Sequence, residues 1–434
     1  MDKNKRLTVW LPVIIAASIA LGIFIGNHYL SISQGKKRSY SSGNKINAIL
    51  DIIDEQYVDT VSMSKLVEST IPKIFSELDP HSVYIPAEDA SVVNEELEGS
   101  FSGIGVSFNM QTDTILVISV ISGGPAEKAG LLPFDRIISI NDSIFSGKKK
   151  NQGEIMKTLR GAKNSTVKLG VQRGNSPELL YFDVTRGDVP VNSVDVSYEA
   201  AKGIGYIKVS KFARNTYNEF ITAIAKLKQA GCTSFVIDLR GNTGGYMDAA
   251  INMINEFMPE GRLIVYTEGK SFPRSDVYAN GTGTCKDAPI VVLTDEISAS
   301  ASEIFSGAIQ DNDRGTIIGR RTYGKGLVQT QMSLSDGSEM RLTIARYYTP
   351  SGRCIQKKYE MGNTDAYDQD IYNRYMHGEF DSADSIKMDD SLKYQTVGGR
   401  TVYGGGGIMP DIFIPRDTSG VTSYYSNVVN SGVL

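Results

Sequence analysis

The chain has 434 residues, of which 41% are hydrophobic and 22% are charged, and its formal net charge is -4. This length allows two or three globular domains, and the nearly balanced charge gives no indication of a nucleic-acid partner. The three cysteines are far apart and form no CxxC pair, which argues against a disulfide scaffold and against a zinc ribbon.

The N-terminal segment differs from the rest in composition. No charged residue stands between Arg6 and Lys36, and Val9–Gly26 is almost wholly apolar, about the length that crosses a bilayer. Its small residues lie inside the apolar run, which favours a retained anchor over a cleaved signal peptide. Basic residues flank the run on both sides, so we infer a cytoplasmic N-terminus from the shortness of the leading segment. We therefore expect residues 1–39 to be a membrane anchor and linker, with the remainder outside the cytoplasm, in the periplasm or cell envelope.

Residues 40–95 are predicted to form an N-terminal helical segment. Apolar residues recur there at helical spacing, namely Ile46, Ile49, Leu50, Ile53, Leu66, Ile71, Ile74 and Leu78. The run Asp79–Ser82 interrupts this pattern, and we interpret His81 as a structural histidine of a proline turn.

Residues 96–188 change to short strands and glycine turns. The stretch Gly124–Leu131, followed by Asp135–Ile137, resembles a PDZ domain. In such domains the loop before the first binding strand offers backbone N–H groups to a peptide's C-terminal carboxylate, and the peptide extends the sheet. That loop would comprise Gly103, Ile104, Gly105 and Val106. A dinucleotide-binding loop is disfavoured, because Phe108 takes the place of the third glycine.

From residue 189 onward, buried strands alternate with amphipathic helices, which indicates an α/β core. Residues 356–400 are polar, rich in tyrosine and aspartate, and lack strong periodicity. We expect them to form a long, solvated surface insertion. The spaced aspartates at 365, 368 and 370 lack the glycine and glutamate of a calcium loop, so no calcium site is predicted.

Ser300 and Lys325 form the most informative pair. Ser300 follows an apolar strand and opens a helical stretch, and Lys325 stands between two glycines. A serine hydroxyl needs a base to become a nucleophile, and a buried lysine with a lowered pKa is such a base. The pair therefore predicts hydrolysis of an acyl bond without histidine. Ser300 and Glu303 also fit a capping box, a purely structural role, although the helix N-terminus equally suits a developing oxyanion.

The other glycine-rich motifs have competing interpretations. The spacing from Gly319 to Lys325 nearly matches a phosphate-binding loop, but Gly326 stands where serine or threonine is required. Lys325 also fits a solvated turn lysine. The run Gly241–Gly245 resembles the nucleophile loop of trypsin-like proteases with Thr243 in the serine's place, yet the histidines support no triad. That run is either a strand-to-helix turn or a source of oxyanion donors facing Ser300.

Taken together, these motifs resemble the C-terminal processing peptidase (tail-specific protease) family. The resemblance extends from about residue 45 to residue 414, and Lys325 follows Ser300 by 25 positions, as in the family pattern. It is carried by the motifs SASASE (298–303), TYGKG (322–326), Gln329, Leu78–Ser82 and Thr343–Gly352.

The resemblance implies Ser300 as nucleophile, Lys325 as general base and Gln329 as the residue that orients the lysine. It also implies an oxyanion hole made of the Gly245 and Ala301 N–H groups. The implied fold is a crotonase- and Clp-protease-like core at 189–434 with an inserted PDZ-like domain, and no metal or cofactor.

The implied partners are unfolded or tail-exposed envelope proteins and the membrane. Assembly into a homo-oligomer is compatible with the resemblance and is left undecided by the sequence. Arg160, at the end of the PDZ-like helix, is either a surface charge or the residue that couples peptide capture to catalysis. The alternatives are a catalytically silent PDZ adaptor and an acyl-CoA enzyme of the crotonase type.

Overall fold

The computed structural model describes residues 16–23, 42–111, 114–145, 152–417 and 422–430. The chain divides into two compact units, Met1–Thr70 and Ile71–Leu434. Each is described by itself.

The first unit contains a helical stretch at 16–23 and the helix α2 (Ser42–Gln56), and α3 (Met63–Ser76) begins in it. The helices expected from the spacing of apolar residues between Ile46 and Leu78 are thus confirmed as α2 and α3. Most of the expected membrane anchor lies outside the described residues. Among the helices that are described, none is both long enough and apolar enough to span a bilayer.

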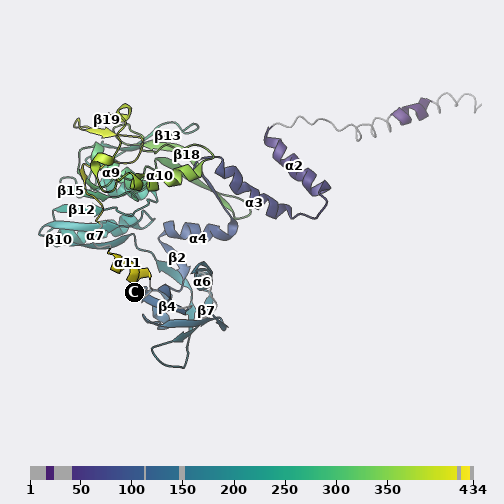
Figure 1. Cartoon of the computed structure of the whole chain (residues 1–434), viewed down its shortest axis with the longest axis horizontal. Helices are drawn as coiled ribbons and strands as arrows, with labels where there is room; N and C mark the ends of the chain where they lie inside the picture. Colours follow the sequence, from purple (N-terminus) through teal and green to yellow (C-terminus); the bar gives the residue numbers. More distant parts are fainter. Residues whose placement is uncertain (1–15, 24–41, 112–113, 146–151, 418–421, 431–434) are drawn as a thin grey trace, which may run out of the picture. The chain divides into compact units, whose positions relative to one another are not determined.

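The PDZ-like region forms an antiparallel sheet, in which β3-β4-β5-β7-β8 lie in this order and β6 pairs with β5. Alternate residues of these strands are fully buried, including Val117, Ile137 and Val171, as expected for a sheet with one face on a core. Figure 1 shows β4, β7 and α6 gathered in one group. The bounds are β3 (Val106–Gln111), β4 (Thr114–Val120), α5 (Pro125–Ala129), β5 (Arg136–Ile140), β6 (Ser143–Ile144), α6 (Gln152–Leu159), β7 (Thr166–Gln172) and β8 (Leu180–Thr185).

The strands before and after this domain pair with each other. β2 (Ser100–Gly103) runs antiparallel to β9 (Gly187–Pro190), with Phe101 opposite Val189. The domain is therefore inserted into the chain through a two-stranded stem. The helix α4 (Ala87–Glu98) precedes it and ends at Gly99, whose φ of 77° is the left-handed conformation that glycine adopts without strain.

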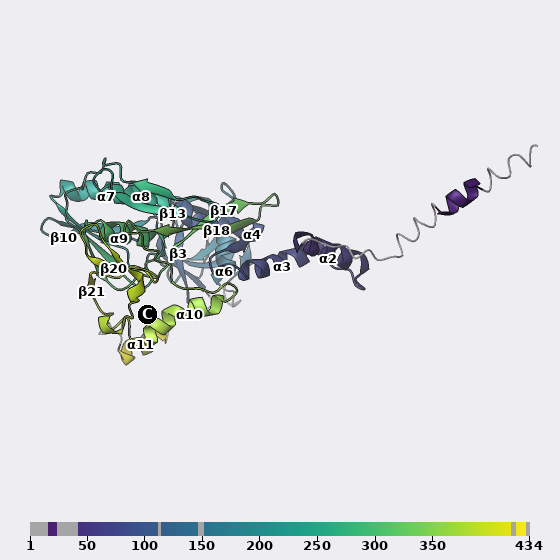
Figure 2. The same cartoon turned by 90° about the horizontal axis from the view of Figure 1, so that it is seen from above.

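The main sheet of the core has the strand order β10-β11-β12-β15-β16-β21 within the described residues. All neighbours from β11 onward are parallel, and β10 is antiparallel to β11. Figure 1 shows β10, β12 and β15 stacked beside α7, and Figure 2 shows α7 and α8 side by side. The bounds are β10 (Val194–Ala201), β11 (Ile204–Val209), α7 (Thr216–Gln229), β12 (Ser234–Asp238), α8 (Met247–Asn255), β15 (Ile290–Thr294), α9 (Ala301–Asp311), β16 (Thr316–Gly319) and β21 (Ile412–Phe413).

This topology brings two loops together. β12 and β15 are adjacent and parallel, so the loops after their carboxyl ends, 239–246 and 295–300, meet at one edge of the sheet. In parallel α/β sheets this edge is where binding and catalytic residues gather. In the hydrophobic core of this part of the chain, the aromatic rings of Phe220, Phe235 and Phe305 surround that of Phe257 with centroid distances of 6.2 to 6.4 Å.

Lys325 lies just before a strand of a second sheet. Its strands lie in the order β1-β18-β13-β14, and β17 pairs with β18. Lys325 stands two residues before β17. The bounds are β1 (Val83–Ile85), β13 (Leu263–Glu268), β14 (Ser275–Tyr278), β17 (Leu327–Ser333) and β18 (Glu339–Tyr348).

The prediction of a solvated insertion at 356–400 is wrong in its central part. The helix α10 (Thr364–Met376) buries Tyr367 and Arg374, and the latter donates to the main-chain carbonyls of Arg321 and Thr322. The helix lacks an apolar stripe because the residues that it buries are a tyrosine and a paired arginine. The segment continues through η1 (Ala383–Ser385), η2 (Asp390–Leu392) and the hairpin β19 (Lys393–Gln395) and β20 (Thr401–Tyr403), and α11 (Ser423–Asn430) follows later.

Candidate active site

Ser300 occupies a strained turn between β15 and α9. Its φ of 55° and ψ of -113° lie in a region that residues with a Cβ rarely adopt. Such strain persists only where the surroundings enforce it, and it concentrates at functional sites. The conformation is enforced by Asn242, whose main-chain carbonyl accepts from the Ala299 N–H (3.0 Å) and from the Ser302 hydroxyl (2.9 Å).

Asn242 also fixes the glycine turn after β12. Its buried side chain donates to the Val209 carbonyl (3.0 Å) and accepts from the Gly244 N–H (2.8 Å). Gly244 lies directly against the serine, because a Cβ added there would stand 2.7 Å from Ser300 Cβ and 3.0 Å from Ala301 N. The turn and the start of α9 therefore form one packed unit.

The predicted oxyanion donors lie in this unit. Ala301 opens α9, where the first N–H groups have no partner within the helix. Gly245 pairs with Phe212 in a parallel bridge, in which the Phe212 carbonyl accepts from the Tyr246 N–H (2.7 Å). A Cβ at Gly245 would stand 2.1 Å from the Phe212 carbonyl oxygen, so only glycine fits this turn.

The buried carboxylate of Glu303 connects Ser300 to the lysine loop. One oxygen accepts from the N–H groups of Ser300 and Lys325, both at 2.8 Å, and the other accepts from the Gly324 N–H (2.8 Å) and the Thr322 hydroxyl (2.5 Å). Burial raises the pKa of Glu303 to about 7, and these hydrogen bonds oppose the shift. The capping interaction considered from the sequence is thus present on the Glu303 side, and it extends to the loop of the candidate base.

Tyr347 of β18 makes a second connection. Its fully buried hydroxyl lies within hydrogen-bonding distance of the Ser300 carbonyl (3.1 Å) and of the Lys325 carbonyl. Burial raises the pKa of this phenol well above its usual range, so the hydroxyl stays protonated. The main chains of Ser300 and Lys325, which come from different sheets, therefore share two partners.

Lys325 is held in surroundings that favour its neutral form. Burial is the largest cause lowering the pKa of its amine, and the charge of Arg341 acts in the same direction. The charges of Glu303 and Asp79 oppose them. The net direction is that required of a lysine acting as a base.

Gln329, implied by the resemblance as the residue that orients Lys325, has no hydrogen bond to it among the described residues. Its side-chain amide donates instead to the Thr343 hydroxyl (3.2 Å), which donates to the Asp79 carboxylate (2.9 Å). Asp79 also accepts from the main chain of His81 (3.0 Å). Asn242, Tyr347, Thr343 and Asp79 lie in motifs that the sequence analysis named, but it assigned none of them a role in the site.

The PDZ-like domain has a cavity at the loop predicted to bind a peptide C-terminus, which we call the groove. A cavity of about 250 Å³ is lined by three of the four predicted loop residues, together with Phe101, Phe108, Met156, Leu159 and Arg160. Gly103, the fourth, belongs to the stem strand β2 instead. Arg160 lies 3.1 Å from Glu95 of α4, and its guanidinium stacks over the Phe101 ring at 4.6 Å. It therefore connects the groove to the helix that precedes the domain.

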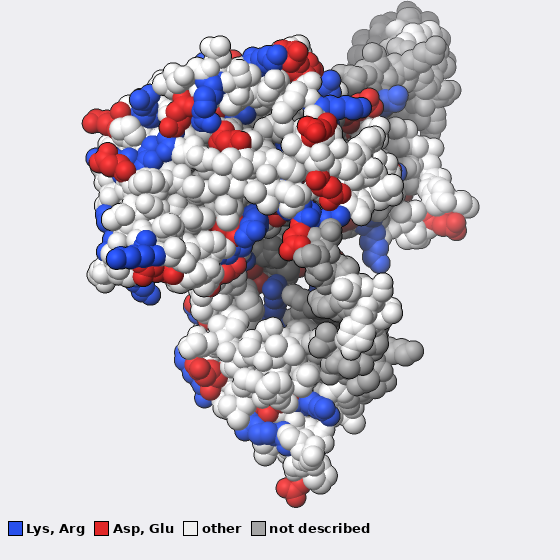
Figure 3. Space-filling model, turned by 60° about the vertical axis from the view of Figure 1, so that its left-hand side comes forward, with Lys and Arg blue, Asp and Glu red and all other residues white. Residues whose placement is uncertain are grey.

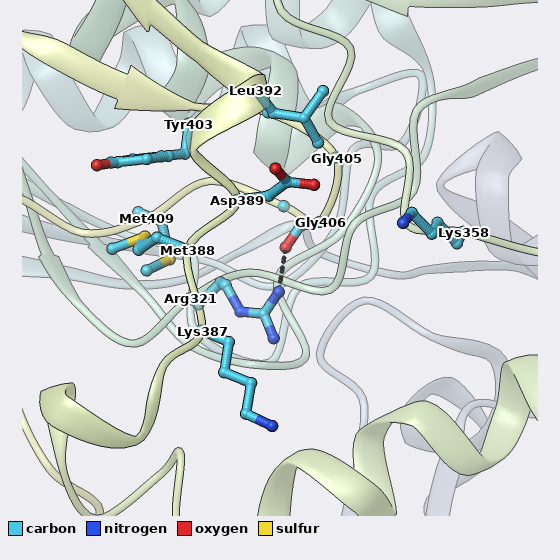
Figure 4. Close-up of a pocket in the computed structure, with 12 residues that line it drawn as sticks. Arg321, Lys358, Lys387, Met388, Asp389, Leu392, Tyr403, Gly405, Gly406 and Met409 are labelled. Carbon is cyan, nitrogen blue, oxygen red and sulfur yellow. Dashed lines mark hydrogen bonds between the residues drawn. The ribbon is translucent and has the colours of Figure 1, made fainter.

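A glycine turn supports the lysine loop from behind. A Cβ at Gly324 would stand 3.2 Å from the main chain of Gly406 and Gly407. The outer face of this turn lines a polar pocket of about 180 Å³, in which Arg321 donates to the Gly406 carbonyl at 2.9 Å (Figure 4). Arg321 also pairs with Glu379, so its role is to hold the turn in place.

Charges on the surface are mixed. Figure 3 shows acidic and basic side chains interspersed over the described residues of one face, without a large area of either sign. A uniform electrostatic field over this face is therefore not available to attract a partner.

Comparisons with known proteins identify the family. Residues 203–365 match the model of peptidase family S41, and residues 102–195 match that of a PDZ domain. The chain is 33% identical over 365 residues to a probable CtpA-like serine protease of Staphylococcus aureus (strain N315), covering 82% of this chain and 72% of the relative.

The chain belongs to peptidase family S41. Another S41 relative, the carboxy-terminal processing protease CtpB of Bacillus subtilis (strain 168), is 35% identical over 318 residues, which is 73% of this chain and 66% of CtpB. Among solved structures, a photosystem II D1 C-terminal processing protease is similar with 25% identity and a TM-score of 0.44, covering 87% of this chain and 94% of that one. This S41 chain is a serine peptidase of the carboxy-terminal processing type with a PDZ domain.

We expect Gly244→Ala to reduce peptide hydrolysis about 100-fold or more, since a displaced serine turn would misplace an oxyanion donor. The added methyl would collide with Ser300 Cβ and the Ala299 carbonyl. Gly241→Ala is the matched control, because Gly241 has a φ of 72° in the same loop but open space around its Cβ position. Steady-state kinetics on an unstructured peptide measures both, and equal rates for the two variants would contradict the predicted packing role of Gly244.

Proposed function

We propose that this chain is a serine endopeptidase that captures the C-terminal tails of envelope proteins in its PDZ groove and cleaves them with a Ser300/Lys325 dyad. The observation that carries the proposal is the Glu303 carboxylate, which accepts hydrogen bonds from the main chains of both residues. It supports a fixed spacing between nucleophile and base.

The chemistry follows from the groups in place. The neutral Lys325 amine removes the proton of the Ser300 hydroxyl as Oγ attacks the peptide carbonyl carbon. The N–H groups of Gly245 and Ala301 stabilise the negative charge that develops on the carbonyl oxygen. The protonated lysine then gives its proton to the departing amine, and water releases the acyl group from Ser300 by the same steps. Gln329 is proposed to orient the lysine indirectly, through Thr343 and Asp79.

Because the neutral amine is the active form, we expect kcat/KM to rise with pH to a plateau. The apparent pKa of this limb should lie below 10.5, the usual value for lysine, since burial lowers the pKa of Lys325.

Ser300→Ala and Lys325→Ala should each lower the rate by orders of magnitude, about 10²–10⁴ for the base alone. Mass spectrometry of peptides released from an unfolded protein measures the loss. A Ser300→Ala protein that still cleaves would refute the dyad, whereas a wild-type protein that releases no peptides would leave the catalytically silent PDZ adaptor as the alternative.

We propose that Arg160 couples occupancy of the groove to catalysis. Its contacts with Glu95 and Phe101 place it between the groove and α4. Arg160→Ala should abolish the difference in cleavage rate between substrates with and without a free apolar C-terminus, while Lys163→Ala, which removes an exposed ion pair with Asp188, should preserve it. An unchanged preference in Arg160→Ala would make this arginine a surface charge only.

We propose that residues 9–26 anchor the chain in the cytoplasmic membrane, with the catalytic body outside. The sequence supports this through the length and apolarity of the segment. A protease added to intact spheroplasts should degrade the body, and membranes washed with alkaline carbonate should retain the full-length chain. A body left untouched in intact spheroplasts would contradict the orientation.

A further inference from the structure

The lysine loop is held on both sides of Lys325 by the chain that follows β18. The Gly326 N–H donates to the Gln356 side-chain oxygen (2.7 Å), and the Gly324 carbonyl accepts from the Lys357 N–H (2.9 Å). A Cβ at Gly326 would stand 2.8 Å from Gln356 N, so the two segments are in close contact. The main chain that carries the base is thus fixed by residues 356 and 357.

Tyr367 of α10 continues this arrangement. Its buried hydroxyl accepts from the Gln356 side-chain amide (3.3 Å) and lies 2.9 Å from His81 Nε2. Burial, followed by the charge of Lys325, lowers the pKa of His81 to about 4, so the imidazole is neutral at physiological pH. A neutral ring accepts the tyrosine proton at Nε2, which lets the hydroxyl donate to one partner and accept from the other.

From His81 the connections return to the lysine strand. The His81 N–H donates to Asp79, which also accepts from the Thr343 hydroxyl, and Thr343 accepts from Gln329 of β17. Gln329 is three residues after Gly326, where the sequence of contacts began. These hydrogen bonds form a ring that the main chain from Gly326 to Gln329 closes, and it runs through Gly326, Gln356, Tyr367, His81, Asp79, Thr343 and Gln329.

We propose that this ring positions Lys325 and shields its amine from water. Tyr367 is the positioning residue through which the segment 356–400 completes the ring. The inference rests on the proposed Ser300/Lys325 mechanism and extends it to a segment that the mechanism does not use. Tyr367 is 3% exposed, and its hydroxyl joins Gln356, which holds the lysine loop, to His81 of the segment before β1. Opening the ring there admits water to the lysine.

The charges around the ring are defined. Arg341, Glu303 and Asp79 act on Lys325, and Asp79, Lys325 and Lys357 act on His81. The Lys357 ammonium lies 4.0 Å from the centre of the Tyr367 ring and 3.2 Å from an Asp370 oxygen. Exchange of Tyr367 for phenylalanine changes none of these charges, so it isolates the effect of the hydroxyl.

The test is the pH dependence of kcat/KM for Tyr367→Phe in the full chain, with an unstructured peptide as substrate. Hydration of Lys325 should move its apparent pKa upward by about one unit, which is a rate about tenfold lower on the acidic limb. The plateau at high pH should stay within about twofold of the wild type, because the nucleophile and oxyanion donors are untouched. Tyr372→Phe is the matched control, since Tyr372 lies on the same helix with 59% of its surface exposed.

Thr343→Val opens the ring on the opposite side and should shift the limb in the same direction. If circular dichroism shows that Tyr367→Phe does not fold, the position of the acidic limb in Thr343→Val tests the ring proposal instead. A limb at the wild-type position in the folded variants, or a rate lowered equally at every pH, would overturn the ring proposal. An inactive wild type, or an active Ser300→Ala, would instead overturn the dyad itself, so the two failures are distinguishable.

Discussion

The catalytic arrangement depends on one buried carboxylate. Glu303 accepts from the main chains of Ser300, Gly324 and Lys325 and from the Thr322 hydroxyl, and it is fully enclosed by protein. Leaving any one of these donors buried without an acceptor would cost about 1–3 kcal/mol of folding free energy. Because Ser300 follows a strand of the parallel sheet and Lys325 precedes a strand of the antiparallel one, this carboxylate joins the serine turn of one sheet to the lysine loop of the other. The contact of Glu303 with the Ser300 N–H adds to those of Asn242 in holding the strained serine turn.

The sequence was sufficient to predict the elements and the chemistry where the signal was local. The buried strands that end near Leu239 and Thr294 predicted an α/β core, and the structure places their loops side by side. The Ser300–Glu303 spacing predicted a capping interaction, which forms half of the Glu303 network. The other half comes from residues about 20 positions away, and local spacing contains no information on that contact.

The segment 356–400 shows why other parts of the structure could not be predicted from the sequence. Helices are recognised by an apolar stripe, but α10 buries a tyrosine hydroxyl and an arginine that are satisfied by partners elsewhere in the chain. Gln329 was expected to orient Lys325, and its amide donates to Thr343 across a β-bulge between β17 and β18. The bulge shifts the register of the strand, and such a shift is set by tertiary packing.

The stem of β2 and β9 has a consequence for the architecture as a whole. Since these strands pair along their length, the chain leaves the core and returns to it at nearly the same place. The core can therefore accept domains of different size at this point without rerouting its own strands. Evolution and protein engineering alike could exchange the recognition module there, giving one hydrolytic centre a new set of substrates.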